Sequence, residues 1–486
     1  MCTAIDLLKR NIHNFVILEK SSSVGGTWHD NKYPGCCCDV WSLLYSYSFE
    51  QNPNWTREYP GQEEILEYLI GVASKYGLYK YIRFNSSVES AKWDDEQRQW
   101  VTSVQLASGS KDREFQKDGS YTITSDFLVS AVGQLNMPKY PDIEGLDTFA
   151  GKTMHSARWD WTYNIRGKRV GLIGNGATAA QIAPEIAKEA AHLTIYQRTP
   201  NWIVPRQDAE VGHLRRTVQK YFPPFMHRLR AGMMDFREST FVAIVQPKSD
   251  MAQMFKDLCL AQMHAALPGR EDMWEKLTPK YAVGCKRILI SDDYYPMLAR
   301  ENVSLETRPI EKITDSGITV KGMPEGPTAT DTDNKIDCLV LATGFRTVEF
   351  MHPIKIIGRN GQALNEIWRD GAVAYNGVTI PGLPNFGMLY GPNTNLGHNS
   401  IILMIESQSK YITAMADAVL QARQRDAKGD SQAERKGNAS RSAENRIALS
   451  PKPSVVDAYN EHIQERLQES SFNDPNCVSW YVRKHD

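Results

Sequence analysis

A glycine-rich turn between two apolar segments is the first feature of this sequence that could do chemistry. Gly174, Gly176 and Ala179 form the pattern G-x-G-x-x-A directly after a β-rich run at residues 169–173. A helical pattern follows, and a second strand is predicted at 193–197. Such glycines let a helix N-terminus approach a pyrophosphate, so the pattern predicts a dinucleotide site. Its further contacts are expected to come from Asn175, Ala177, Thr178 and Gln181.

The end of the second predicted strand indicates which dinucleotide binds. A site for NAD places an acidic residue there to hold the ribose hydroxyl group. This chain instead has Arg198 and Thr199, which suit a 2′-phosphate, so we expect NADPH. A solvated arginine after a strand is the alternative interpretation.

The first residues resemble a second nucleotide unit that is incomplete. A helix is predicted at 3–11, and the strand at 14–20 contains Glu19 near its end. An acid at this point fits the unphosphorylated ribose of FAD. Gly26, Thr27 and Trp28 follow and would bring backbone close to the flavin. The initial strand and glycine loop of such a unit are missing before residue 3, so we expect either an N-terminally truncated chain or impaired flavin binding.

The overall pattern predicts an α/β fold with two Rossmann-like dinucleotide-binding domains, and 486 residues exceed the size of one core. Apolar strands are expected at 127–133 and 338–345, each ending in small residues. We predict an FAD-binding domain at 1–150, an NADPH-binding domain at 151–335 with a helical insertion at about 205–280, and a return to the FAD domain at 336–486. Few apolar residues occur at 425–448, where we expect a disordered insertion.

Composition excludes several classes of partner. The formal net charge of −1 gives no bias toward nucleic acid or anionic lipid. None of the eight cysteines has a CxxC neighbour, so we expect free thiols and no metal site. Neither a signal peptide nor a run of ~18 apolar residues is present, which predicts a soluble, cytoplasmic protein. The oligomeric state stays open.

One longer motif points to a specific family. Phe149, Gly151, His155, Trp159 and Asp160 stand in the pattern F-x-G-x-x-x-H-x-x-x-W-D. This pattern resembles the fingerprint of Baeyer–Villiger monooxygenases, in the form that ends in Asp. The resemblance implies the flavin monooxygenase type of fold, with His155 coupling the movement of the two domains.

The same resemblance implies roles for two further segments. The segment Tyr33-Pro34-Gly35-x-x-Cys38-Asp39-Val40, with Tyr45 beyond it, is similar to the loop that packs on the flavin in this family. The segment Gly284-Cys285-Lys286-Arg287 resembles the one that delivers the active-site arginine. Arg287 is then expected to stabilise negative charge on oxygen, Asp39 to hold Arg287, and Lys286 to reach the 2′-phosphate of NADPH.

The implied reaction is the oxidation of a small-molecule ketone by O₂ to an ester or lactone. The segment 382–398 resembles that of a family branch with aryl-ketone oxidisers, and the opening sequence resembles fungal members of sterigmatocystin and aflatoxin biosynthesis, which act on aromatic polyketides. Alternatives are a monooxygenase that oxidises nitrogen or sulfur, and an inactive truncated homologue. A disulfide reductase is disfavoured because the reactive dithiol is missing.

Overall fold

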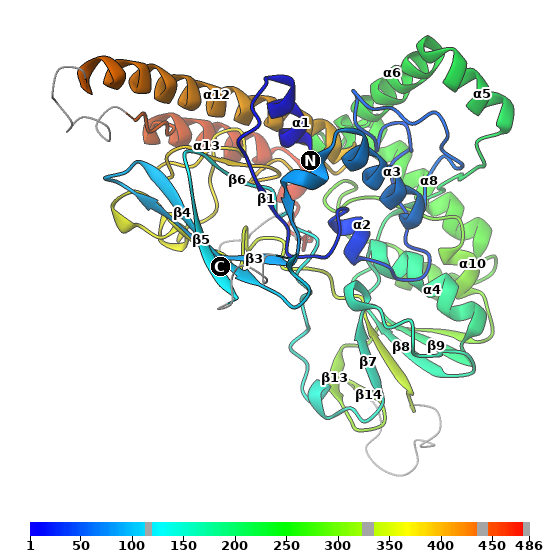
Figure 1. Ribbon diagram of the computed structural model, residues 1–486. Helices are drawn as coiled ribbons and strands as arrows, with labels where there is room; N and C mark the ends of the chain where they lie inside the picture. The colour runs from blue at the N-terminus through cyan, green and yellow to red at the C-terminus, as the bar shows by residue number, and fades with distance from the viewer. Residues whose placement is uncertain (112–118, 323–334, 435–445, 480–486) are drawn as a thin grey trace.

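The computed structural model describes residues 1–111, 119–322, 335–434 and 446–479 (Figure 1). It has two nucleotide-binding units. The second unit is a parallel sheet with its helices, and the opening unit combines the N-terminal residues with strands and helices from the last third of the chain. In the described residues, no helix is both long enough and apolar enough to cross a membrane.

The second unit is built on a five-stranded parallel sheet in the order β12-β9-β8-β15-β7. Helix α4 connects β8 to β9, which confirms the β-α-β unit expected from the sequence. Apolar residues of the strands and of α4 form one core, because the helices that cover this face of the parallel sheet exclude water. The elements are β7 (Lys152–His155), β8 (Arg169–Ile173), α4 (Ala177–Glu189), β9 (His192–Tyr196), β12 (Val303–Glu306) and β15 (Cys338–Leu341).

The opening unit combines short parallel pairings with one antiparallel meander. Strands β1 and β2 form one parallel pair and β6 and β17 another, while β16, β3, β4 and β5 form a four-stranded sheet. Helix α1 packs against the long α12 (Figure 1). The elements are α1 (Cys2–Lys9), β1 (Ile17–Leu18), α2 (Thr27–Asp30), α3 (Gln62–Lys75), β2 (Ile82–Arg83), β3 (Ser86–Asp94), β4 (Gln99–Leu106), β5 (Ser120–Ser125), β6 (Leu128–Ser130), β16 (Lys355–Ile357), α11 (Leu364–Ile367), β17 (Phe386–Met388), α12 (Ile401–Glu434) and α13 (Pro453–Gln468).

Helices occupy most of the segment in which a helical insertion is expected. They extend from the second unit toward the opening unit, and the short parallel pair of β10 and β11 lies beside them. The elements are β10 (Ile203–Val204), α5 (His213–Tyr221), α6 (Pro223–Ser239), α7 (Val242–Val245), α8 (Asp250–Ala266) and α9 (Glu271–Leu277). After this segment come β11 (Leu289–Ile290), α10 (Tyr294–Leu298) and the antiparallel pair of β13 (Ile310–Ile313) and β14 (Ile318–Val320).

Two segments bear on the predicted boundaries. Strand β15 pairs with both β7 and β8, so it extends the sheet of the second unit, although it follows the boundary predicted at residue 336. A buried apolar strand is compatible with either sheet, and only the pairing decides between them. Helix α12 continues to Glu434, inside the segment 425–448 where disorder is expected, and the Leu449 amide donates to Asn385 just after that segment. Residues 435–445 lie outside the described part of the chain.

The expectation that every cysteine is a free thiol is also wrong. Cys285 and Cys477 form a disulfide across a sequence separation of 192 residues. Both side chains are buried in one apolar cluster, so the fold brings together two cysteines whose spacing in the sequence gives no sign of pairing. The other six cysteines are free.

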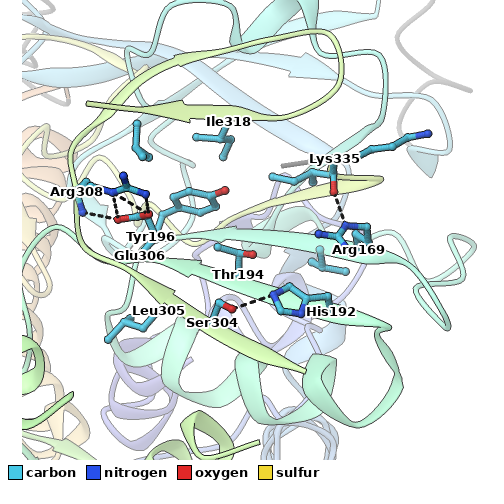
Figure 2. Close-up of a pocket in the computed structure, with 13 residues that line it drawn as sticks. Arg169, His192, Thr194, Tyr196, Ser304, Leu305, Glu306, Arg308, Ile318 and Lys335 are labelled. Atoms are coloured by element: carbon cyan, nitrogen blue, oxygen red, sulfur yellow. Dashed lines mark hydrogen bonds and ion pairs between the residues drawn. The ribbon is translucent and has the colours of Figure 1, made fainter. Parts of the chain in front are cut away.

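The sheet of the second unit carries a cavity on the face turned away from α4. Side chains alternate along a strand, so His192, Thr194 and Tyr196 point away from the core that α4 covers. Figure 2 shows them below Ile318 of β14, with Tyr196 next to the Glu306–Arg308 ion pair and His192 next to Ser304. None of the site residues predicted from the sequence lines this cavity, so the chemistry is not placed here.

Candidate functional site

The turn between β8 and α4 leaves room for a ligand at the helix N-terminus. Gly174 has φ +110°, and a Cβ there would lie 2.5 Å from the carbonyl oxygen of Ala342. Gly176 faces open space, since a Cβ built there has no heavy atom within 4 Å. Ala177 is exposed at the first position of α4, while Ala179 is buried against the sheet. Exposed backbone N–H groups at a helix start fit a pyrophosphate.

Two cations converge near this turn. Arg198 is exposed at the end of β9, and Lys286 lies over the ring of Tyr281 with Nζ 4.7 Å from its centroid. The Tyr281 hydroxyl donates to the Pro200 carbonyl oxygen at 3.0 Å, which brings Lys286 near the segment that follows Arg198. Burial, together with the charge of Arg198, lowers the pKa of Lys286. Within the described residues neither cation has a carboxylate at ion-pair distance. This arrangement fits a phosphate group.

Two residues expected to contact the dinucleotide have other partners. Asn175 donates to the Gln197 side chain and to the Thr199 carbonyl oxygen, both at 2.9 Å, and so fixes the turn against the end of β9. Gln181 points to the opening unit: it accepts from the Tyr33 hydroxyl at 2.9 Å and donates to the Cys37 carbonyl at 3.0 Å. These contacts direct the Gln181 side chain toward the opening unit, and its expected contact with the dinucleotide stays a prediction. Thr178 is half-buried beside Tyr33.

The predicted flavin residues line one side of the opening unit. Glu19 follows β1 and accepts a hydrogen bond from the Ser21 amide at 2.8 Å. Gly26 has φ +52° and open space at its Cβ position, just before Thr27 begins α2. The Trp28 indole donates to the Tyr45 hydroxyl at 3.0 Å, and Val40 is buried. The open space at Gly26 leaves room for a ligand beside the backbone, and the expected contact with the flavin stays a prediction.

An ion pair joins the two units at Asp39. The Arg287 guanidinium donates through Nε and Nη2 to the two carboxylate oxygens, with the Nη2 contact at 2.7 Å, and through Nη1 to the Leu396 carbonyl at 2.9 Å. Both side chains are about a quarter exposed, at 25% and 27%. Burial acts to raise the pKa of Asp39, but Arg287 outweighs it and holds that pKa below its usual value. The geometry therefore favours a carboxylate and a guanidinium that both stay charged.

A cavity opens beside this ion pair. Asp39, Lys286 and Arg287 line it together with two residues that sequence reasoning missed, Arg237 of α6 and His398. Arg237 lies inside an amphipathic helix, where the sequence predicts that an arginine faces solvent. No local pattern distinguishes Arg237 from the other arginines of this helix. His398 is buried, and burial lowers its pKa.

The fingerprint motif lies partly in strand β7. Gly151 has no room for a side chain, since a Cβ would be 2.7 Å from the Asp337 carbonyl oxygen. His155 is 1% exposed and accepts from the Ala157 amide at 3.1 Å, and burial lowers its pKa to about 4. Asp160 pairs with Lys152 at 2.5 Å. Phe149 is buried and Trp159 packs on the core of the second unit, so the motif fixes the edge of the sheet.

Comparison with known proteins agrees with this geometry. Residues 16–354 match the model of the family described as flavin-binding monooxygenase-like. The chain is 51% identical over 482 residues to the FAD-binding monooxygenase ktnD of Aspergillus niger, covering 99% of this chain and 74% of that protein. It is 39% identical to a Baeyer–Villiger monooxygenase of Streptomyces coelicolor, covering 99% of this chain and 84% of that one.

Solved structures give the same result. Oxidised steroid monooxygenase bound to NADP superposes with a TM-score of 0.78 at 28% identity, covering 99% of this chain and 91% of that one. Cyclohexanone monooxygenase from Rhodococcus sp. Phi1, bound to NADP⁺, has a TM-score of 0.78 at 25% identity, covering 97% and 88%. The predicted fold, enzyme class and pair of cofactors are thereby confirmed. This chain belongs to the flavin-binding monooxygenase-like family.

Proposed function

We propose that the chain oxidises a ketone to an ester or lactone, with FAD and NADPH as cofactors and O₂ as the oxygen source. The observation that carries this proposal is the Asp39–Arg287 pair, which sets a permanent cation in a cavity at the junction of the two units. Ketone oxygenation needs such a charge, because negative charge develops on the carbonyl oxygen. Oxidation of an amine or sulfide does not.

The cofactor residues divide between the units. Gly174, Gly176 and the start of α4 would hold the pyrophosphate of NADPH, and Arg198 with Lys286 its 2′-phosphate. Glu19 would hold the FAD ribose, with Gly26, Thr27, Trp28, Val40 and Tyr45 against the flavin. FAD, when bound, supplies the oxygen-transfer chemistry after reduction by NADPH.

Arg287 acts on the reacting oxygen atoms through its charge. A guanidinium keeps its proton in proteins, so it stabilises negative charge without giving up a proton. Asp39 fixes its orientation with two hydrogen bonds, and the Leu396 carbonyl fixes a third N–H. A donor held in place before the reaction stabilises a developing oxyanion without a cost of reorganisation.

The substrate we propose is an aromatic ketone of the polyketide type, as in fungal sterigmatocystin-like biosynthesis. The apolar side chains on the cavity wall, among them Phe255, support a substrate with an apolar body. His155 and the fingerprint motif are proposed to link the movement of the units, from their place at the edge of the second unit's sheet.

Product analysis tests the reaction class. Purified enzyme with FAD, NADPH and O₂ is given an aryl ketone or an aryl sulfide in parallel, and mass spectrometry follows the gain of one oxygen. We expect ester from the ketone at a rate well above that of sulfoxide formation, and no product without NADPH. Rapid sulfoxide formation with no ester would establish the heteroatom monooxygenase instead.

A further inference from the structure

The cavity beside Asp39 contains a second guanidinium that the reaction described above does not use. Helix α6 brings Arg237 to the backbone of Asp39, where its Nη2 lies 3.5 Å from the carbonyl oxygen. The guanidinium carbon lies 4.7 Å from the centroid of the Trp41 ring. The Nε atom of Arg237 is buried and has no hydrogen-bond partner. These contacts position the side chain, and among the described residues none of its hydrogen bonds goes to a carboxylate.

The charges around the cavity do not cancel. Among the described residues that line it, Asp39 is the one carboxylate, and both its oxygens are taken by Arg287. Lys286 and Arg237 remain, and Lys286 lies toward Arg198 at the phosphate end. Within the described residues, no carboxylate oxygen comes within the ion-pair distance of 4.0 Å from Arg237. A partly buried guanidinium without a counterion is costly, and an anionic ligand would offset that cost.

The remaining wall is apolar. Val204, Ala243, Ile244, Phe255, Ile288 and Ile290 line the cavity together with the charged residues. A ligand that fits such a lining has an apolar body and one anionic group, because a fully polar ligand would leave the apolar wall uncovered and a neutral one would leave Arg237 unpaired.

We propose that Arg237 is a specificity-determining residue that binds a carboxylate on the ketone substrate, so that the enzyme prefers apolar ketones with an acidic group. This inference rests on the proposed oxidation of ketones and adds the class of ketone. The Asp39–Arg287 pair faces the carbonyl group that reacts, and Arg237 holds the acidic end of the same molecule against Trp41.

The test compares acids with their neutral esters. The probes are 3- and 4-acetylbenzoate and their methyl esters, which share the apolar body and differ in charge. Dissociation constants are measured by calorimetry on the holoenzyme, and kcat/KM by product formation. The variants are Arg237→Leu, Arg237→Lys and the control Arg228→Leu, an exposed arginine on the same helix.

We expect the wild-type enzyme to bind at least one acid more tightly than its ester. Arg237→Leu should weaken binding of that acid by roughly 10- to 100-fold, as for a lost hydrogen bond to a charged group, and leave ester binding unchanged. Arg237→Lys should restore part of the preference, and Arg228→Leu should behave as wild type. Unchanged ester binding shows that the variant is folded.

Two outcomes would overturn the inference: equal binding of acids and esters by the wild type, or equal losses for both in Arg237→Leu. The second would mean that Arg237 supports the site only through packing. The calorimetric comparison needs no turnover, so it is separate from the proposed reaction. Oxygenation of both probes without a preference defeats the inference alone, whereas selective acid binding without ester product defeats the reaction alone.

Discussion

The two nucleotide-binding units are held together in different ways. In the second unit, backbone pairing along five parallel strands places the turn at Gly174, and α4 packs directly on that sheet. In the opening unit, β1 pairs over two residues with β2, and the loop carrying Asp39 depends on side chains of the second unit, Gln181 and Arg287. The comparison teaches that the dinucleotide turn is fixed within its own sheet, whereas the Asp39–Arg287 pair is completed by a contact between the units.

The largest expected effect comes from removing the charge at that contact. Arg287→Ala should lower ester formation by ~10²–10³, the usual cost of losing one preorganised donor to an oxyanion. NADPH should still be consumed under O₂, with hydrogen peroxide as the product, because the turn at Gly174 and the cations at Arg198 and Lys286 are intact. Peroxide and ester are measured together. Arg359→Ala, at an exposed arginine, serves as the control. Ester formation by Arg287→Ala at the parent rate would refute the role of Arg287.

A second effect concerns stability rather than turnover. Burial lowers the pKa of His155 to about 4, below its ordinary value of 6.5. As the pH falls, His155 therefore becomes protonated in the unfolded chain at a higher pH than in the folded protein. The contribution of neutral His155 to the free energy of unfolding should be fully present above pH 6.5. The free energy of unfolding should fall by up to about 3 kcal/mol as the pH drops toward 4. His155→Gln should flatten this part of the curve in urea unfolding. The exposed His227→Gln should not, and parallel curves for wild type and His155→Gln would show that His155 does not titrate in this way.

Coenzyme choice tests the second unit by itself. Arg198→Ala should raise the KM for NADPH by roughly 10- to 100-fold, the equivalent of ~1.5–3 kcal/mol for a charged hydrogen bond, and hardly change that for NADH. Steady-state NADPH and NADH oxidation gives both constants. Lys286→Ala should act in the same direction, since the two cations lie together. Equal changes in KM for both coenzymes would show that Arg198 does not bind the 2′-phosphate.

The smallest expected effect lies at the joint between the units. Gln181→Met removes the hydrogen bonds to Tyr33 and Cys37 and should lower the free energy of unfolding by about 1 kcal/mol. The ester yield per NADPH should fall, while the KM for NADPH should stay near that of the parent. Gln253→Met, on an exposed part of α8, is the matched control. A rise in the KM for NADPH with an unchanged ester yield per NADPH would show instead that Gln181 binds the dinucleotide.

The parts of the fold that follow from local pattern were predictable. Apolar residues and a glycine turn are contiguous in the second unit, so β8 and β9 could be predicted within about one residue, with a helix between them. The Asp39–Arg287 pair joins residues 248 positions apart and was accessible only through resemblance to a family. Arg237 and His398 were missed because α6 and the loop before α12 reach the cavity through packing. The place of β15 in the sheet and the Cys285–Cys477 disulfide likewise depend on which distant segments become neighbours.

The long reach of the Arg287 contacts has a consequence for the order of folding. Its guanidinium connects to Asp39, 248 residues earlier, and to Leu396, 109 residues later. Closing such long loops carries an entropic cost and slows the formation of the contacts that need them. During refolding, the second unit should acquire its native sheet early, whereas catalytic competence should appear in a later kinetic phase, when all three segments have met.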